Sequence, residues 1–212
     1  MTSRRRETTR TAAQALREKP WCIDSRHREY TFDEFVATVE EFHGYAAPGL
    51  VLGGTMVALA LRELPPGVLF DAICETPNCL PDAIQLLTPC TMGNGWLRVH
   101  DTGRFAVTLF DKETGDGVRV AVRADLLEPW PEAKAFFFKL VPKRQQNSAK
   151  LTEELHLAGT SLCEVKRVRV RPEARRKAHA GPVAVCPGCG EGFPVRDGEK
   201  CLACQGSTYL DR

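Results

Sequence analysis

The chain has 212 residues, of which 43% are hydrophobic and 26% are charged. This length suits one ordinary core with a small appendage, and the hydrophobic content excludes a disordered chain. No stretch approaches the roughly 20 apolar residues that a membrane-spanning helix needs. The basic start, residues 1–6, has no apolar run behind it, so we expect neither a secreted nor a membrane protein and assign the chain to the cytoplasm.

The net charge is only +2, but the positive charge is unevenly spread. Four arginines lie within residues 4–10, and a second basic run extends over residues 166–177. Basic runs can bind phosphates, but both runs lack the aromatic residues that would stack on bases. We therefore expect a flexible basic arm over residues 1–30 and a basic linker over residues 171–182, and we disfavour nucleic acid as a partner.

Two helices are predicted first. Residues 31–43 begin with a capping-box sequence and continue with apolar residues at helical spacing. A second helix is expected from Pro48, which suits the first helical position, to the prolines at 65–66. Its Gly49 and Gly53 lie four residues apart, so another backbone can approach that face closely, which is compatible with a dimer contact.

A sheet is expected to follow. An apolar strand at 68–74 and a brief helix at 81–87 precede three stretches of alternating apolar residues, at 97–99, 105–109 and 118–122. Short turns between these three stretches imply antiparallel pairing. Because the helices are segregated from this meander, the predicted fold class is α+β, an antiparallel sheet with helices packed on it. The remaining core elements are expected at 131–140 (helix), 148–157 (helix) and 162–170 (strand), which gives a core over residues 31–170.

The chain closes with two C-x2-C pairs, Cys186 with Cys189 and Cys201 with Cys204, and eleven residues separate the pairs. A two-residue gap curls the backbone so that both sulfurs of a pair point inward. Four thiolates at about 2.3 Å complete a tetrahedron around zinc. We predict one structural zinc ion per chain in a small finger over residues 183–212. The alternative is two disulfides or four unconnected thiols. The five remaining cysteines are an odd number, which fits poorly with a disulfide framework.

A further cysteine could carry chemistry. Cys79 and Asp82 lie at the amino end of the predicted helix at 81–87, where the helix dipole is expected to lower the pKa of the thiol. The alternative is a small buried thiol beside an ordinary first-turn aspartate. Cys90 lies beyond the other end of this helix, so it shares a ligand with Cys79 only if the next loop folds back. His43 closes the first helix, where a histidine is commonly just a dipole partner.

Several segments together resemble the E-subunit family of formylmethanofuran dehydrogenase. They are residues 43–49 (HGYAAPG), 75–85 (ETPNCLPDAIQ), 90–95 (CTMGNG) and 117–120 (GVRV), in the family's order. The closing cysteine pairs resemble the zinc finger often appended to this family. The resemblance implies an α+β core, a treble-clef-type zinc finger and frequent assembly as a homodimer. It also implies an association with molybdenum- or tungsten-dependent oxidation of formyl- or formate-level carbon, whose oxidoreductase subunits become candidate partners.

One departure from the family's pattern concerns a core metal. The first motif of the family usually reads His-Gly-His-x-Cys-Pro-Gly. Here His43 matches the first histidine, but Tyr45 stands in place of the second and Ala47 in place of the cysteine. A phenol is a poor zinc ligand near pH 7, and alanine has no donor atom. We therefore expect no second metal ion in the core. The expected pocket residues are His43, Tyr45, Cys79, Asp82, Cys90 and Asn94.

Three functions stay open at this point. The first is a zinc-containing accessory or binding protein of molybdenum or tungsten redox metabolism, whose pocket binds a ligand without turnover. The second is an enzyme that depends on a metal or uses Cys79 as a thiolate nucleophile, with Asp82 and His43 as further candidates for catalytic roles. The third is a nucleic-acid-binding regulator that uses the basic linker and the zinc finger. We favour the first, although the sequence does not say whether turnover occurs.

Overall fold

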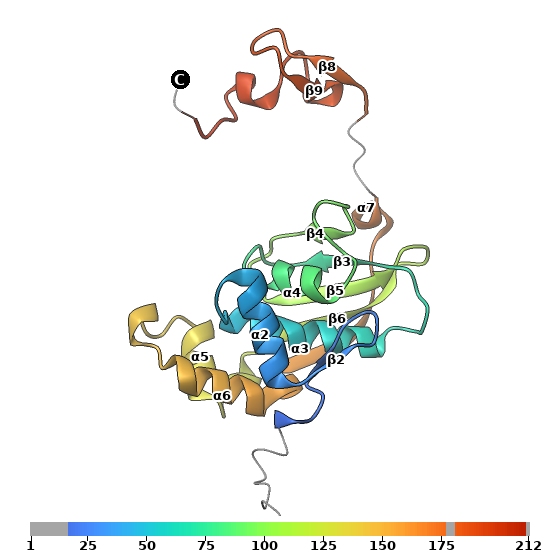
Figure 1. The fold of residues 1–212 in the computed structure, drawn as a ribbon. Coiled ribbons are helices and arrows are strands. Elements are labelled where there is room, and N and C mark those ends of the chain that lie inside the picture. The colour runs from blue at the N-terminus through green and yellow to red at the C-terminus, as the bar shows by residue number, and fades with distance from the viewer. Residues whose placement is uncertain (1–16, 177–180, 211–212) are drawn as a thin grey trace, which may run out of the picture. The chain divides into compact units, whose positions relative to one another are not determined.

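The computed structural model describes residues 17–176 and 181–210, and the chain forms two compact units (Figure 1). The first unit ends at Arg175 and contains the α+β core; the second begins at Arg176 and contains the four clustered cysteines. Of the expected basic arm, residues 1–16 lie outside the described residues, as do residues 177–180 of the expected linker.

The segment before residue 31 belongs to the core. Strands β1 (Cys22–Ile23) and β2 (Glu29–Tyr30) form an antiparallel hairpin, in which Cys22 and Tyr30 are buried. The ring of Trp21 packs edge-on against Phe32, with 5.0 Å between the ring centroids. The core therefore begins earlier than expected, because the apolar side chains of this hairpin give it a buried face that a solvated arm would lack.

The first two predicted helices are present. Helix α2 (Phe32–His43) begins with a complete capping box, in which Thr31 and Glu34 exchange hydrogen bonds between side chain and backbone. Helix α3 (Pro48–Glu63) begins at the expected proline, and 11 of its 16 residues are buried. No single helix among the described residues is long and apolar enough to cross a membrane; α2 and α3 pass that test only as a pair bent by 120°.

Close packing of α3 against α4 (Leu80–Leu87) depends on two glycines. A Cβ atom at Gly49 would lie 3.0 Å from the Cβ of Cys79, and one at Gly53 would lie 2.7 Å from the Cβ of Ala83. The close approach that the glycine spacing predicted is therefore real, but it is made within the chain. This face of α3 is occupied by α4, so it is not a dimer contact.

Five strands form the main sheet in the order β4-β3-β5-β6-β7. Their bounds are β3 (Phe70–Cys74), β4 (Leu97–Val99), β5 (Ala106–Asp111), β6 (Asp116–Val122) and β7 (Cys163–Arg169). The predicted antiparallel meander from β4 to β5 is wrong in one respect: β3 lies between these strands, parallel to β4 and antiparallel to β5. The reason is that α4 connects β3 to β4 as a crossover, which returns the chain in the same direction. The other pairings are antiparallel, and the α+β class is confirmed.

Two further helices complete the core. Helix α5 (Pro131–Phe137) ends three residues before the predicted end, and α6 (Ser148–Ala158) matches its prediction closely. The two helices are tied together by the buried carboxylate of Glu154, which accepts hydrogen bonds from the backbone N–H groups of Glu132 and Ala133 at 2.9 and 3.0 Å. The loop between α5 and α6 becomes important for the candidate site.

The end of the core and the second unit follow. A single helical turn, α7 (Pro172–Arg175), is held to the core by a hydrogen bond of 2.9 Å from Arg98 to the carbonyl of Arg175, so the expected linker is partly structured. In the second unit, β8 (Val183–Val185) and β9 (Gly192–Pro194) form an antiparallel hairpin beside the cysteine cluster. The small cysteine-bearing finger is therefore present as predicted.

Candidate functional site

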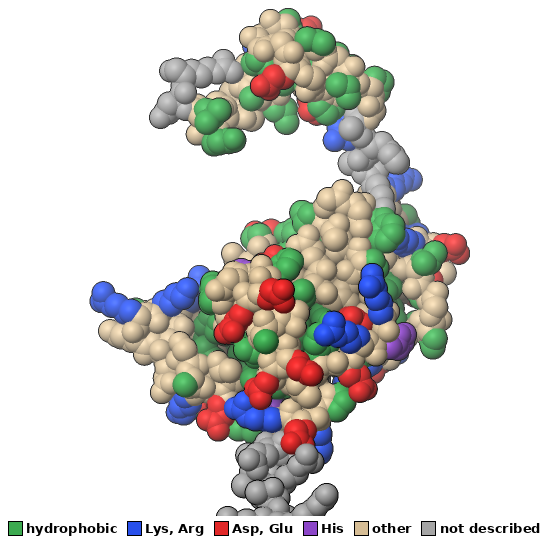
Figure 2. Space-filling view, viewed as in Figure 1, with side chains coloured by type: hydrophobic (Ala, Val, Ile, Leu, Met, Phe, Trp, Pro, Cys, Tyr) green, Lys and Arg blue, Asp and Glu red, His purple; other side chains and the backbone are tan. Residues whose placement is uncertain are grey.

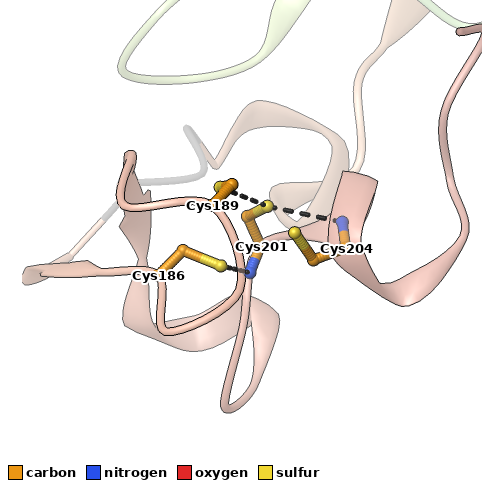
Figure 3. Close-up of side chains that lie close together, drawn as sticks. All are labelled: Cys186, Cys189, Cys201 and Cys204. Atoms are coloured by element: carbon orange, nitrogen blue, oxygen red, sulfur yellow. Dashed lines mark hydrogen bonds between the residues drawn. The ribbon is translucent and has the colours of Figure 1, made fainter. Parts of the chain in front are cut away.

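The four closing cysteines gather at one point in the second unit (Figure 3). Their sulfur atoms all lie within 4.8 Å of one another. Backbone N–H groups also point at the sulfurs: that of Cys201 donates to Cys186 Sγ, and that of Cys204 donates to Cys201 Sγ, both at 3.4 Å. Four thiolate donors with this clustering fit a closed, structural zinc site.

The pKa values of the thiols in this cluster favour the binding of a soft cation. Backbone N–H groups, that of Cys201 first, lower the pKa of the Cys186 thiol to about 6. The N–H of Glu191 also acts to lower the pKa of Cys189, but desolvation and the hydrogen bonds of the neighbouring thiols raise it to about 12. Four crowded sulfurs cannot all ionise unaided, and a divalent cation in their centre supplies the compensating charge.

In the core, the structure brings together four of the six expected pocket residues. His43, at the end of α2, is hydrogen-bonded through Nδ1 to Oδ2 of Asp82 in the first turn of α4, at 2.9 Å. The ring of Tyr45 packs on His43 with 5.0 Å between centroids. Cys79 is the N-cap residue of α4 and lies just before Asp82 in the chain.

Cys79 has an unusual backbone and a thiol whose pKa is raised. Its φ of 54° is in the left-handed region, which non-glycine residues seldom adopt, and its side chain packs against Gly49. Burial, followed by the charge of Asp82, raises the pKa of the thiol, and the charge of Lys143 only partly opposes this. The expected lowering of this pKa is therefore wrong: desolvation and a neighbouring carboxylate outweigh the helix terminus.

The other two expected pocket residues lie elsewhere. Cys90 is buried beyond the far end of α4, and its Sγ donates to the carbonyl of Phe70 at the start of β3, whereas Cys79 follows the end of β3. Asn94 is exposed, and its side chain holds its own turn through three hydrogen bonds to backbone groups. An eight-residue helix is about 12 Å long, so α4 separates these two residues from Cys79. The loop after α4 reaches back to Gln85, whose side chain accepts from the N–H of Met92, while Cys90 stays hydrogen-bonded to Phe70 at the start of β3.

A cavity of about 680 Å³ opens beside Cys79. Its lining residues come from α3, from the loops after β3 and before β5, and from the end of α5 with the loop that follows it. They are Gly49, Thr76, Asn78, Cys79, Gly103, Phe105, Phe136, Phe137, Lys139, Val141, Pro142, Lys143 and Gln146. Of these residues, the sequence predicted only Cys79 as part of a pocket. A signal for the rest was the run of three phenylalanines at 136–138, because one buried helix face cannot hold three consecutive side chains and some of them must line another surface.

The segment that carries Cys79 is anchored by a buried carboxylate. Glu75 lies directly after β3, and its side chain is only 8% exposed. Arg119 on β6 binds it with two hydrogen bonds of 2.6 and 3.0 Å, and Arg104 lies at 2.7 Å. Burial acts to raise the pKa of Glu75, but the hydrogen bond and charge of Arg119 and the charge of Arg104 hold it below its ordinary value. The carboxylate is therefore ionised at neutral pH and fixes the start of the loop.

Comparison with known proteins shows that both units match models of one family. Residues 42–170 match the family described as FmdE, molybdenum formylmethanofuran dehydrogenase operon, and residues 177–211 match the FmdE treble clef zinc finger. A solved structure, that of a tungsten formylmethanofuran dehydrogenase FmdE-like protein from Syntrophus aciditrophicus, is 49% identical with a TM-score of 0.76. That match covers 85% of this chain and 96% of the other.

A curated relative has a different name. The probable S-adenosyl-L-methionine-binding protein of Archaeoglobus fulgidus is 32% identical over 195 residues. The match covers 80% of this chain but 52% of the relative, so the chain spans about half the length of that protein.

The cysteine cluster leads to a test by metal analysis. We expect one zinc ion per chain after dialysis, measured by mass spectrometry, and loss of tightly held zinc in the Cys204→Ser variant, because a neutral hydroxyl replaces one of four thiolates. The Cys79→Ser variant is the control and should keep its zinc. Native zinc content in Cys204→Ser, or two tightly held metal ions per chain, would contradict this assignment.

Proposed function

The chain belongs to the FmdE family, and on that premise we propose that it is a zinc-containing accessory or binding protein whose core cavity holds a ligand without converting it. The observation that carries this proposal is the cavity beside Cys79, where burial and Asp82 hold the pKa of the thiol above its ordinary value. A cavity of this size is typical of small-molecule sites. In this proposal the zinc ion stabilises the finger and takes no part in chemistry.

The metabolic setting is proposed from the family description alone. Its wording refers to a molybdenum formylmethanofuran dehydrogenase operon, and the solved relative is named for the tungsten enzyme. We infer a role beside molybdenum- or tungsten-dependent redox enzymes of formyl- or formate-level carbon, in the cytoplasm and as a homodimer. Genes for such an enzyme should neighbour this one in the genome; their consistent absence would remove the support for this setting.

An enzyme with Cys79 as nucleophile is the second candidate. The positive φ of Cys79 favours it, because strained residues cluster at functional sites. The raised pKa of the thiol weighs against it. The hydrogen bond of His43 to Asp82 does not, because it uses Nδ1 and leaves Nε2 available. A nucleophilic cysteine needs a lowered pKa or an adjacent base.

The nucleic-acid-binding alternative has the least support. Three residues of the basic run on β7 are paired with carboxylates: Lys166 with Glu164, Arg167 with Glu63 and Arg169 with Asp116, at 2.7–2.9 Å. Part of the charge that would bind phosphates is therefore already paired with carboxylates of the first unit.

Alkylation kinetics test the absence of nucleophilic catalysis. With iodoacetamide at pH 7, Cys79 of the whole chain should react more slowly than glutathione, because a raised pKa leaves less thiolate at that pH. The rate should continue to rise at pH values above the ordinary pKa of a thiol. Mass spectrometry of the peptide containing Cys79 gives the rate, and the Cys79→Ser variant is the blank. Reaction faster than glutathione at pH 7 would reject the binding-only function and favour the enzyme.

A further inference from the structure

The cavity beside Cys79 has a chemical character that points to one class of ligand, an inference that rests on the proposed binding function. We propose that the cavity binds an organic anion with a flat apolar body: aromatic side chains hold the body, and Lys139 and Lys143 bind the negative charge.

Aromatic rings form the apolar wall of the cavity. The rings of Phe105 and Phe137 meet edge to face with 5.5 Å between centroids, and Phe136 meets Phe137 in the same way at 5.3 Å. All three rings are only partly buried, so they present surface to the cavity. Val141 and Pro142 extend this surface. Such a wall suits a planar ring system, which can stack on a face or meet an edge.

The charged groups of the lining are all positive. It contains two lysines and no carboxylate. Figure 2 shows Lys and Arg side chains gathered over the loop between α5 and α6, which carries both lysines. Asp82, whose charge acts on Cys79, is hydrogen-bonded to His43. The lining itself therefore presents two positive charges to a ligand, and the carboxylate of Asp82, which acts on Cys79, lies outside the lining.

Neither lysine forms an ion pair with a carboxylate of the residues that the structure describes. Within residues 17–176 and 181–210, no ion pair involves the ammonium group of Lys139 or Lys143; Lys143 instead lies 5.2 Å from the centre of the Tyr45 ring. Both residues are exposed, so their ammonium groups are accessible to a ligand. The side-chain amides of Asn78 and Gln146 add hydrogen-bonding groups to the same lining.

Backbone strain is concentrated at this cavity. Among the described residues, three that are not glycine have a positive φ, and two of them, Cys79 and Lys139, line the cavity. Lys139 follows the end of α5 with a φ of 52°, a conformation that glycine adopts at no cost and lysine does not. Lys139 occupies the left-handed position that commonly ends a helix, and the N–H groups of Lys139 and Leu140 donate to the carbonyls of Phe136 and Ala135.

Three probes with one ring system separate shape from charge. They are 2-naphthoate (anionic), 2-naphthamide (neutral) and 2-naphthylmethylammonium (cationic), titrated calorimetrically into the full chain with its zinc. We expect 2-naphthoate to bind about three- to tenfold more tightly than 2-naphthamide, as two half-exposed ion pairs allow. The cation should bind most weakly.

Lysine variants assign the charge preference to residues. The Lys139→Met/Lys143→Met double variant should bind 2-naphthoate no better than 2-naphthamide and should keep its affinity for the neutral probe. Lys19→Met, at an exposed lysine outside the cavity lining, is the matched control and should retain the full preference.

The other outcomes overturn the inference in distinguishable ways. Equal affinity for 2-naphthoate and 2-naphthamide would remove the charge selection but leave the binding function standing. Tightest binding of the cation would overturn the anion assignment and favour a sulfonium ligand, as the name of the Archaeoglobus relative suggests for that protein. Binding of none of the three probes would count against the proposed binding function itself.

Discussion

The close contact between α3 and α4 is the constraint on which the core site depends. It exists because two positions of α3 have no side chain: Gly53 faces Ala83 of α4, and Gly49 faces Cys79 at its start. Since α4 is also the crossover between β3 and β4, this contact fixes both the strand order at that edge of the sheet and the position of Cys79. The cavity beside Cys79 is bounded on one side by the same Gly49 backbone.

A second constraint acts from the sheet. The carboxylate of Glu75, directly after β3, is held by Arg119 and Arg104, so the loop that leads to Cys79 has a fixed start as well as a fixed end. Removing one partner of a buried ion pair leaves the other charge uncompensated. A substitution of Glu75 or Arg119 alone should therefore destabilise the protein. Between these two fixed points, Cys79 keeps a strained backbone and a partly buried thiol. A thiol with a raised pKa is a poor nucleophile. It therefore suits a cavity that binds a ligand better than an active site in which the thiol attacks the ligand.

Much of this structure follows from local sequence signals. The capping box at Thr31, the proline at the start of α3 and the paired cysteines of the finger each act through near neighbours in the chain, so each was predictable. Predictions that depended on distant contacts fared less well. The β4–β5 pairing failed because short turns do not reveal that β3 is inserted, and the pKa of Cys79 depends on burial and on Asp82 rather than on the helix terminus alone.

The cavity itself was largely beyond sequence reasoning. Its wall combines Gly49, Phe105 and the loop after α5, which are far apart in the chain and meet only through the fold. Cys90 and Asn94 share motifs with a recognisable family, yet one side chain is buried behind β3 and the other organises a turn. A shared motif therefore indicates a common fold as readily as a common site.

The stability and affinity of the Gly53→Ala variant test the central contact most directly, because Gly53 holds α4 in place without lining the cavity. Alanine favours a helix over glycine by about 1 kcal/mol, but here its methyl group would lie 2.7 Å from the Cβ of Ala83 and must displace α4. We predict that the free energy of unfolding in urea falls by about 1–2 kcal/mol and that 2-naphthoate binds more weakly. Gly93→Ala, where the nearest atom is 4.0 Å away, is the control and should change stability by less than about 0.5 kcal/mol. Native stability and native affinity in Gly53→Ala would contradict the account.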